Sequence, residues 1–524
     1  MFKRSGVLLS RITVLLLVIF PFISYWNVNK HESAFDLLVY IKESLIIYAS
    51  VILFLFLFVA VLSKGLSYFL PKLPAISEKI ALASGISFIF LFTFSLVHDP
   101  LIYVFGRFES SWPIGFSLLL FSVFTLSLLL AKYEKFRDLT TLVSIFIVLL
   151  PSLQIGYYLV FSQTSYVEAK LDQKAVIEPK SEINLKGLDR PNVYYVVVDA
   201  YGGADALRRF VDLDIGEFLD AVRERDMFLA DSAKSPYNLT FLTLAAILTA
   251  NYPIDEFSQV YTNRRGFYPG LMVRDSSPPT VAHFDKLGYA FNVFGNRWGR
   301  CQSRHVVCPP THSPGYLSYE IHGLLSATPF AWYQSRYGLG FIDPMPSKEI
   351  DAIGNLMDYL QRIGRPESPA VFFVHHLSPH PPYMFKSDCS IRESYSFDFD
   401  GWSEEEKPLY AANTRCTNNK ILSLLDWIDI NDPKSMVVIT GDHGTAFSKS
   451  DSTAERASTL TLARFPSWCQ QGLSQSVNSV NLMRIAMACA AGKEPELLEN
   501  KTYFGTYKMT GERAGRVRLV HPKP

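Results

Sequence analysis

The end of one predicted strand offers the clearest chemistry in this 524-residue chain. A run of mostly β-branched apolar residues at 436–440 is followed by Gly441, Asp442, His443 and Gly444. Such a run, bounded by glycine, predicts a buried strand of an α/β sheet, and ligands of these sheets bind at the carboxyl ends of strands. Asp442 and His443 would supply oxygen and nitrogen ligands for a divalent metal ion. The alternative is a purely structural turn between a strand and a helix.

Two more strand ends carry candidate ligands. Residues 193–198 form a continuous apolar run, typical of a strand buried on both faces of a parallel sheet, and Asp199 follows it directly. A further apolar run ends in His375 and His376, and His380 lies four residues beyond His376. Because side chains alternate along a strand, His376 is predicted to face the site with His380, and His375 is predicted to be structural.

A threonine is the candidate nucleophile. A loop containing Pro236 and Asn238 leads into an apolar helical pattern, which places Thr240 at or near a helix N-terminus. The unpaired N–H groups and the dipole of a helix N-terminus favour phosphate. A hydroxyl beside a divalent cation is activated for attack, because the metal depresses its pKa. The alternative is that Thr240 only caps the helix.

Strands and helices alternate through the C-terminal two-thirds of the chain. Predicted strands cover residues 192–199, 228–230, 288–294, 370–376 and 436–440. Predicted helices cover residues 215–225, 239–249, 281–287, 350–363 and 413–430. This alternation predicts an α/β domain with a mainly parallel sheet, and about 330 residues are enough to bury a large core.

The first third of the chain is strongly apolar. Only 19% of all residues are charged and 49% are hydrophobic, which indicates a membrane portion. Five apolar stretches, each near the roughly 20 residues that a spanning helix needs, lie at 7–25, 45–62, 81–97, 113–130 and 141–161. The first stretch lacks a small-residue cleavage site and is predicted to be an uncleaved anchor. Lys and Arg gather before the first span and after the second and fourth, which predicts a cytoplasmic N-terminus and an external C-terminal domain.

The six cysteines agree with an external domain, since all of them lie after the apolar third. An even count confined to one region indicates disulfides formed in an oxidising compartment, and the alternative is six unrelated buried thiols. Pairing in chain order would join Cys301 to Cys308, Cys389 to Cys416 and Cys469 to Cys489, among about fifteen arrangements. The net charge of +1 does not favour a nucleic-acid partner.

Together these motifs resemble the alkaline phosphatase/sulfatase superfamily. The resemblance rests on Asp199 after the first strand of the domain, Thr240 at the start of a helix and the Gly-Asp-His-Gly motif at 441–444. Five spans followed by an outward-facing domain look like its lipid-using branch, which contains lipoteichoic acid synthases, phosphoglycerol transferases and phosphoethanolamine transferases. The resemblance implies an α-helical membrane domain followed by an α/β/α alkaline-phosphatase-like domain.

The resemblance also implies the roles of individual residues. Asp199, Thr240, Asp442 and His443 would bind one divalent ion, for which Zn, Mn and Mg all remain open, and Thr240 would be the nucleophile. Two-metal members place further ligands at the spacing of His376 and His380 and need a third histidine after the Gly-Asp-His-Gly motif. In this chain the only later histidine is His521, three residues from the end, so one metal ion is favoured and a second stays an alternative.

The remaining candidates would handle the phosphate. His376 and His380 are predicted to bind the phosphate or the attacking and leaving oxygens, and Asn238, Arg297 and Arg300 are candidate substrate-binding residues. The alternative for both arginines is a solvent-facing position. Sulfatases of the superfamily need a Cys/Ser-x-Pro-x-Arg motif to form formylglycine, and this chain has none, so hydrolysis of sulfate esters is not expected.

These patterns predict an enzyme of the bacterial envelope with a transmembrane domain at 1–165, a linker at 166–190 and an extracytoplasmic catalytic domain at 191–524. The resemblance implies that a phosphoethanolamine or phosphoglycerol group passes from a phospholipid donor to an envelope glycan or lipid through a phospho-threonine. One alternative is a phosphodiesterase or phosphatase that uses water as the acceptor. Another is a degenerate protein that binds a glycan or a partner and transfers nothing. The headgroup, the acceptor, the metal and the oligomeric state stay open.

Overall fold

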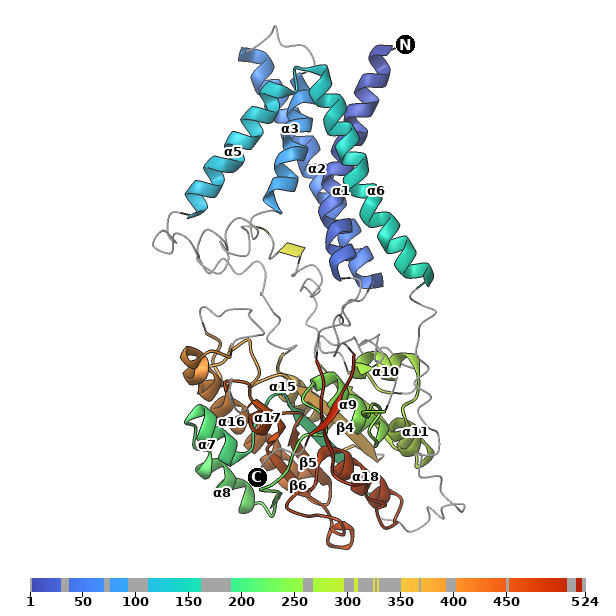
Figure 1. Cartoon of the computed structure of the whole chain (residues 1–524), viewed down its shortest axis with the longest axis vertical. Coiled ribbons are helices and arrows are strands. Elements are labelled where there is room, and N and C mark those ends of the chain that lie inside the picture. Colours follow the sequence, from blue (N-terminus) through green and yellow to red (C-terminus); the bar gives the residue numbers. More distant parts are fainter. Residues whose placement is uncertain are drawn as a thin grey trace. The chain divides into compact units, whose positions relative to one another are not determined.

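The computed structural model is shown in Figure 1, with the chain divided into two compact units, Met1–Ser165 with Gly315–Met345 and Tyr166–Pro314 with Pro346–Pro524. The structure describes residues 2–29, 37–69, 76–92, 112–161, 190–257, 267–295, 306–309, 324–325, 328, 350–366, 369–392, 402–448, 452–506 and 515–520. The predicted substrate-binding residues Arg297 and Arg300 lie outside these ranges, as do Cys301 and His521.

The first unit is helical in its described part. Its helices are α1 (Phe2–Asn29), α2 (Leu37–Phe69), α3 (Ile76–Leu91), α5 (Trp112–Leu130) and α6 (Glu134–Phe161). They coincide with the five apolar stretches of the sequence, although residues 93–97 of the third stretch lie outside the described part. Three of these helices, α1, α2 and α6, are long and apolar enough to cross a membrane. The finding supports a membrane-associated protein, and the number of five spans stays a prediction.

A buried polar contact joins two helices of this unit. The Thr13 and Thr141 hydroxyls, from α1 and α6, lie 2.8 Å apart and are buried. Phe54 and Phe56 on α2 are 65% and 70% exposed. Hydroxyl pairs between helices and outward-facing apolar side chains suit a lipid environment, where backbone and side-chain polar groups must be satisfied within the protein.

The second unit is built on a six-stranded sheet with the order β2-β6-β5-β1-β4-β3. The strands are β1 (Val193–Val198), β2 (Phe228–Leu229), β3 (Ala290–Phe294), β4 (Ala370–His376), β5 (Met436–Gly441) and β6 (Thr461–Arg464). Strands β3, β4, β1 and β5 are parallel, and β6 runs antiparallel to β5. In the register of the sheet, Val198 lies opposite both His376 and Gly441. The residues that follow β1, β4 and β5 therefore leave the sheet at one edge.

Helices cover both faces of this sheet, and the outer helices of the two sets lie on opposite sides in Figure 1. One set packs with the odd-numbered side chains of β1 and includes α9 (Thr240–Thr249), α10 (Pro269–Asp275), α11 (Pro279–Lys286) and α18 (Ser479–Ala490). The other packs with the even-numbered side chains and includes α7 (Ala204–Val211), α8 (Gly216–Arg223), α15 (Ala352–Ile363) and α16 (Lys407–Asn431). Alternation along a strand buried on both faces produces this three-layer arrangement. The predicted α/β/α fold with a mainly parallel sheet is confirmed.

Two disulfides lie in the described part of this unit. Cys389 pairs with Cys416 and Cys469 pairs with Cys489, as chain-order pairing predicts. Cys308 is also disulfide-bonded. These bonds support folding in an oxidising compartment.

Replacing both Cys469 and Cys489 with alanine is expected to lower the free energy of unfolding by about 3 kcal/mol, because the bond closes a loop with a sequence separation of 20. Denaturant unfolding followed by tryptophan fluorescence measures the loss. The double variant should also lose less stability on reduction than the parent protein. An unchanged unfolding midpoint would show that this disulfide adds nothing to stability.

Candidate metal and nucleophile site

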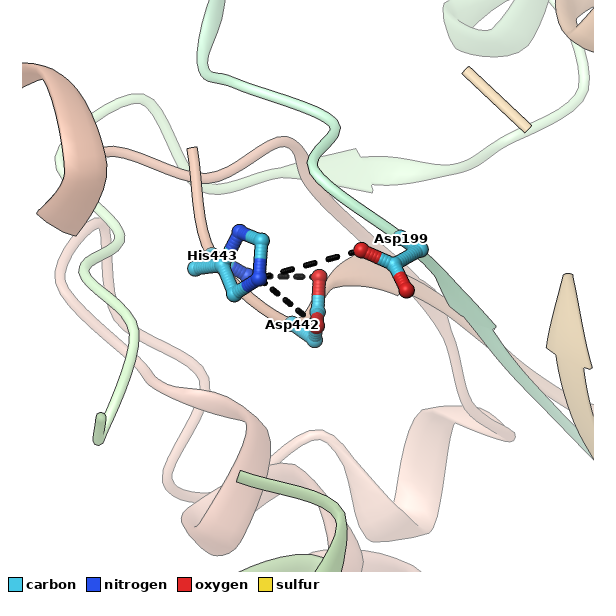
Figure 2. A group of neighbouring side chains, drawn as sticks. All are labelled: Asp199, Asp442 and His443. Carbon is cyan, nitrogen blue, oxygen red and sulfur yellow. Dashed lines mark hydrogen bonds and ion pairs between the residues drawn. The ribbon is translucent and has the colours of Figure 1, made fainter. Parts of the chain in front are cut away.

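Three buried ligand groups meet where β1 and β5 end. Asp199 follows β1, and Asp442 and His443 follow β5, and one ligand atom from each lies within 4.8 Å of the others. The Nε2 atom of His443 is 3.2 Å from Asp442 Oδ2 and 3.7 Å from Asp199 Oδ1. Figure 2 shows the two carboxylates converging on this ring nitrogen. All three side chains are fully buried.

Two glycines allow the Gly-Asp-His-Gly turn to lie close to neighbouring backbone. A Cβ on Gly441 would collide with the carbonyl oxygen of Tyr201, in the loop after β1. A Cβ on Gly444 would collide with the carbonyl oxygen of Glu455, in helix α17 (Ser452–Ala457). The Gly-Asp-His-Gly turn is therefore clamped between two stretches of backbone, which fixes the direction of both ligand side chains.

The tautomer of His443 follows from its contacts. Its Nδ1 lies 3.0 Å from the Gly444 carbonyl oxygen and must donate to it, so Nε2 carries the lone pair. Burial, followed by the charge of Arg456, lowers the pKa of His443 well below its ordinary value. A neutral imidazole held by a hydrogen bond at its other nitrogen is the form that binds a metal.

The carboxylates also suit a cation. Asp442 Oδ1 accepts hydrogen bonds of 2.8 Å from the N–H groups of Ala200 and His443. Asp442 Oδ2 is buried and accepts no hydrogen bond from the residues that the structure describes. Burial, followed by the charge of Asp199, raises the pKa of Asp442. The Asp199 and Asp442 carboxylates are buried close together and need a compensating positive charge. Asp199, Asp442 and His443 therefore fit a divalent ion.

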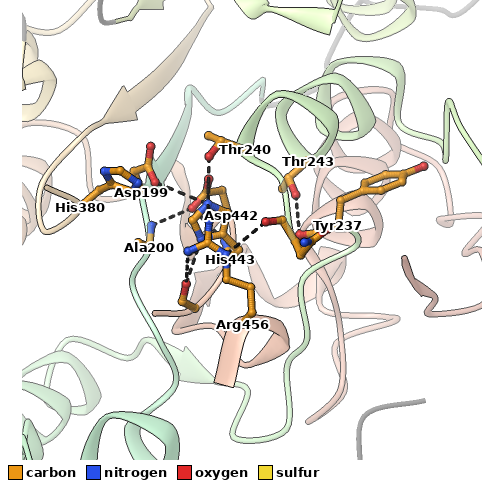
Figure 3. Close-up of polar contacts among 12 residues, drawn as sticks. Asp199, Ala200, Tyr237, Thr240, Thr243, His380, Asp442, His443 and Arg456 are labelled. Carbon is orange, nitrogen blue, oxygen red and sulfur yellow. Dashed lines mark hydrogen bonds and ion pairs between the residues drawn. The ribbon is translucent and has the colours of Figure 1, made fainter. Parts of the chain in front are cut away.

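Thr240 contacts the cluster formed by Asp199, Asp442 and His443 from the start of helix α9. It is the first residue of α9, its side chain is buried, and its Oγ1 lies 2.9 Å from His443 Nε2 (Figure 3). The N-cap position belongs to Leu239, which has no capping side chain. The alternative of a capping threonine is therefore wrong, and the Thr240 hydroxyl is directed at the cluster.

The histidines of β4 face opposite to the prediction. His375 Nε2 lies 3.4 Å from Asp199 Oδ2, whereas His376 Nδ1 accepts a 3.4 Å bond from the N–H of Ile353 and lies 3.8 Å from Asp351 Oδ1. His375 pairs with Val197, whose side chain belongs to the face that α9 covers. That face carries Thr240, so His375 is directed toward the cluster and His376 toward α15.

His380 does join the site. Its ring centroid is 6.3 Å from that of His443 and 5.4 Å from that of Trp402. It is partly buried, whereas His375 and His443 are fully buried. Its predicted role at the phosphate stays a prediction.

The family model described as Sulfatase matches residues 191–467, which contain every residue of the candidate site. The chain belongs to the sulfatase family. It is accordingly an enzyme that acts on sulfate or phosphate esters, of the alkaline phosphatase/sulfatase superfamily that the sequence motifs resemble. No curated protein matches the chain.

Solved structures similar to this sulfatase-family chain share little sequence with it. The C-terminal periplasmic domain of EcEptC from Escherichia coli is 14% identical, with a TM-score of 0.39, over 62% of this chain and 92% of that one. The same domain in complex with Zn is 13% identical, with a TM-score of 0.40, over 65% and 94%. The phosphonate monoester hydrolase SpPMH from Silicibacter pomeroyi is 16% identical, with a TM-score of 0.38, over 60% and 79%.

Asn238 has a different place in this sulfatase-family enzyme from the predicted one. Its Oδ1 accepts a 2.8 Å bond from the Gly505 N–H, and its Nδ2 donates a 3.3 Å bond to the Gly505 carbonyl. Both ends of the amide thus hold the loop before Thr240 to the chain after β7 (Thr502–Phe504). This is a structural role.

The sequence patterns missed Arg456, on α17. Its Nη2 lies 3.0 Å from His443 Nε2, and its Nη1 donates a 3.2 Å bond to the Gly444 carbonyl. Figure 3 shows the guanidinium beside the His443 ring. A lone arginine in a six-residue helix gives no sequence signal, so only the fold reveals its position.

Proposed function

We propose that this protein is a membrane-anchored, metal-dependent transferase that moves a phosphoethanolamine or phosphoglycerol group from a phospholipid to an envelope glycan or lipid. Residues 1–165 would form the membrane domain and residues 191–524 the catalytic domain, in the periplasm or outside a bacterial plasma membrane. The observation that carries the proposal is the buried Thr240 hydroxyl, directed at His443 from the first turn of α9.

Thr240 is suited to nucleophilic attack on phosphorus. A hydroxyl is a weak nucleophile unless a base or a cation activates it. A divalent ion of Zn, Mn or Mg held by Asp199, Asp442 and His443 would supply the charge that depresses the hydroxyl pKa and offsets charge on the phosphate oxygens. The helix N-terminus adds N–H groups and a favourable dipole for an anion at the same place.

The reaction then proceeds in two displacements. The Thr240 hydroxyl gives up its proton as Oγ1 forms a bond to phosphorus and the bond to the diacylglycerol oxygen breaks. That oxygen takes up a proton and leaves as the diacylglycerol hydroxyl, and a phospho-threonine carrying the headgroup remains. A hydroxyl of the acceptor attacks that phosphorus, and Thr240 is restored. His380 is the imidazole that we assign to the leaving and entering oxygens, because it is only partly buried.

A membrane anchor suits a transferase whose donor is a phospholipid. Three helices can hold the catalytic domain at the bilayer, where the donor lipid is concentrated. An enzyme acting on water-soluble esters would gain less from this arrangement.

The test is incubation of the purified full-length protein with phosphatidylethanolamine or phosphatidylglycerol vesicles and Mn or Zn. Release of diacylglycerol, together with a mass adduct on the peptide that contains Thr240, would support transfer and identify the donor. Recovery of all the headgroup as a water-soluble phosphate ester, even with a glycan acceptor present, would indicate a hydrolase. Metal-loaded, folded protein that yields neither diacylglycerol nor an adduct would contradict a lipid donor.

A further inference from the structure

Arg456 is the one positively charged side chain that contacts the cluster of ligands within the described part of the chain. We propose that its guanidinium binds the phosphate that Thr240 attacks and supplies the second positive charge of a one-metal centre. This inference rests on the proposed phosphoryl chemistry, although it does not depend on which ester is the donor.

The guanidinium is held in position by backbone on both sides. Arg456 Nε donates a 3.2 Å bond to the Asn238 carbonyl, two residues before Thr240, and Nη1 donates to the Gly444 carbonyl, just after His443. The fork of Arg456 therefore spans the nucleophile loop and the ligand turn. A guanidinium fixed in this way loses little conformational entropy on binding an anion.

The helix that carries Arg456 is itself tied to the ligand turn. The buried Glu455 carboxylate accepts hydrogen bonds from the Thr445 hydroxyl and from the N–H groups of Phe447 and Ser448. The Gly444 N–H donates to the Arg456 carbonyl at 2.8 Å. These contacts make α17 and the Gly-Asp-His-Gly turn one rigid element, so the guanidinium is preorganised beside the site.

The contacts of His443 Nε2 indicate what the Arg456 guanidinium would bind when a metal ion is present. Thr240 Oγ1 at 2.9 Å and Arg456 Nη2 at 3.0 Å both contact Nε2, which has a single lone pair. When that lone pair binds a metal ion, the Nη2 hydrogens need another acceptor. A non-bridging phosphate oxygen at the nucleophile is the acceptor that the reaction provides, and arginine binds such oxygens strongly.

Charge balance leads to the same role. The two carboxylates offset the divalent ion, and a phosphodiester adds one negative charge that Arg456 would compensate in a buried site. A second divalent ion would lie next to a permanent guanidinium charge and be repelled by it. The Arg456 guanidinium centre also lies 5.8 Å from the Trp402 ring centroid, and both side chains are partly exposed.

The experiment titrates inorganic phosphate into Mn-loaded full-length protein by calorimetry, with metal content measured on the same samples. We expect one metal per chain, phosphate affinity at least about tenfold lower in Arg456→Gln, and partial recovery in Arg456→Lys, because a charged hydrogen bond is lost and then partly restored. The matched control is Arg208→Gln, a surface arginine whose side chain is 61% exposed, which should bind phosphate like the parent protein.

Three results would overturn the inference. One is unchanged phosphate affinity in Arg456→Gln, and another is two metal ions per chain in the parent protein. The third is loss of metal from both Arg456→Gln and Arg456→Lys, which would make Arg456 only a support for the ligand turn. Because this experiment uses no lipid, its outcome does not depend on whether the donor is a phospholipid. Likewise, failure to find phosphate binding by Arg456 would leave the lipid-donor proposal untouched.

Discussion

Thr240→Ala protein should lose transfer activity by about 10⁴-fold or more, the range seen when a catalytic nucleophile is removed. The substitution deletes the hydroxyl that lies 2.9 Å from His443 Nε2 and leaves the proposed metal ligands Asp199, Asp442 and His443 in place. Headgroup transfer and diacylglycerol release measure the loss, and the mass adduct on the peptide should disappear with them. Metal content should fall much less than activity.

Two variants of the same helix control this experiment. Thr243 is also buried on α9, but its hydroxyl donates a 3.1 Å bond to the Tyr237 carbonyl and not to the cluster. Thr243→Ala should therefore cost about 1 kcal/mol of stability and keep most of the activity. Thr240→Ser keeps a hydroxyl and should retain measurable transfer. If Thr240→Ala works nearly as well as the parent protein, the nucleophile is another group.

The strands that carry the site were predictable because each is a continuous apolar run that ends abruptly in a polar residue. Burial on both faces requires such a run, and the carboxyl ends of parallel strands must share one edge. Asp199, Asp442 and His443 therefore come together in the structure as the sequence indicated. Thr240 did too, since its loop leads directly into an apolar helix.

What the sequence could not show is which face of the sheet carries the site. The alternation along β4 separates His375 from His376, but choosing between them requires knowing that α9 packs on the face of Val197. That choice is tertiary, and the expectation that His376 faces the cluster was wrong for this reason. Arg456 was invisible for a similar reason, because α17 has six residues and its position depends on Glu455 and the glycine turn.

Later elements were also missed where their patterns are weak. Strand β6 has four residues and runs antiparallel at the side of a parallel sheet. Helix α18 is buried along its whole length, so it shows no polar face by which an amphipathic helix would be recognised. Helix α16 begins at Lys407, ahead of the predicted residue 413, because Glu404, Glu405 and Glu406 form a short helical turn that leads into it.

Asp442→Asn is expected to produce the second large effect, a loss of metal binding without loss of the fold. Asparagine can keep the Oδ1 acceptor for Ala200 and His443, but it removes the charge. Metal affinity is expected to fall at least about 100-fold, beyond the range seen when only the partner of a ligand is lost. Equilibrium dialysis with metal analysis measures the change, and transfer activity should fall with it.

The same substitution should make the metal-free protein more stable near neutral pH. Burial and Asp199 raise the pKa of Asp442 in the folded state, so the folded protein binds a proton more tightly than the unfolded chain. Stability of the metal-free parent should therefore rise as the pH falls from neutral toward 4, while Asp442→Asn shows a flatter profile. Thermal unfolding with and without added metal tests both statements, since metal should raise the midpoint of the parent and not of the variant.

Asp432→Asn is the matched control, a buried aspartate just before β5, at the opposite end of that strand. Its Oδ2 accepts hydrogen bonds from the Asn192 amide at 2.7 Å and from the Tyr194 hydroxyl at 3.2 Å. Replacing it should lower stability, because a charged acceptor is lost, and should leave metal content unchanged. Equal metal binding by Asp442→Asn and the parent would place the ion elsewhere and remove the basis for a metal-activated Thr240. If Asp442→Asn instead loses the metal and its metal-free form is more stable than the metal-free parent, two conclusions follow. The Asp199 and Asp442 carboxylates bind the ion, and their proximity lowers the stability of the metal-free fold.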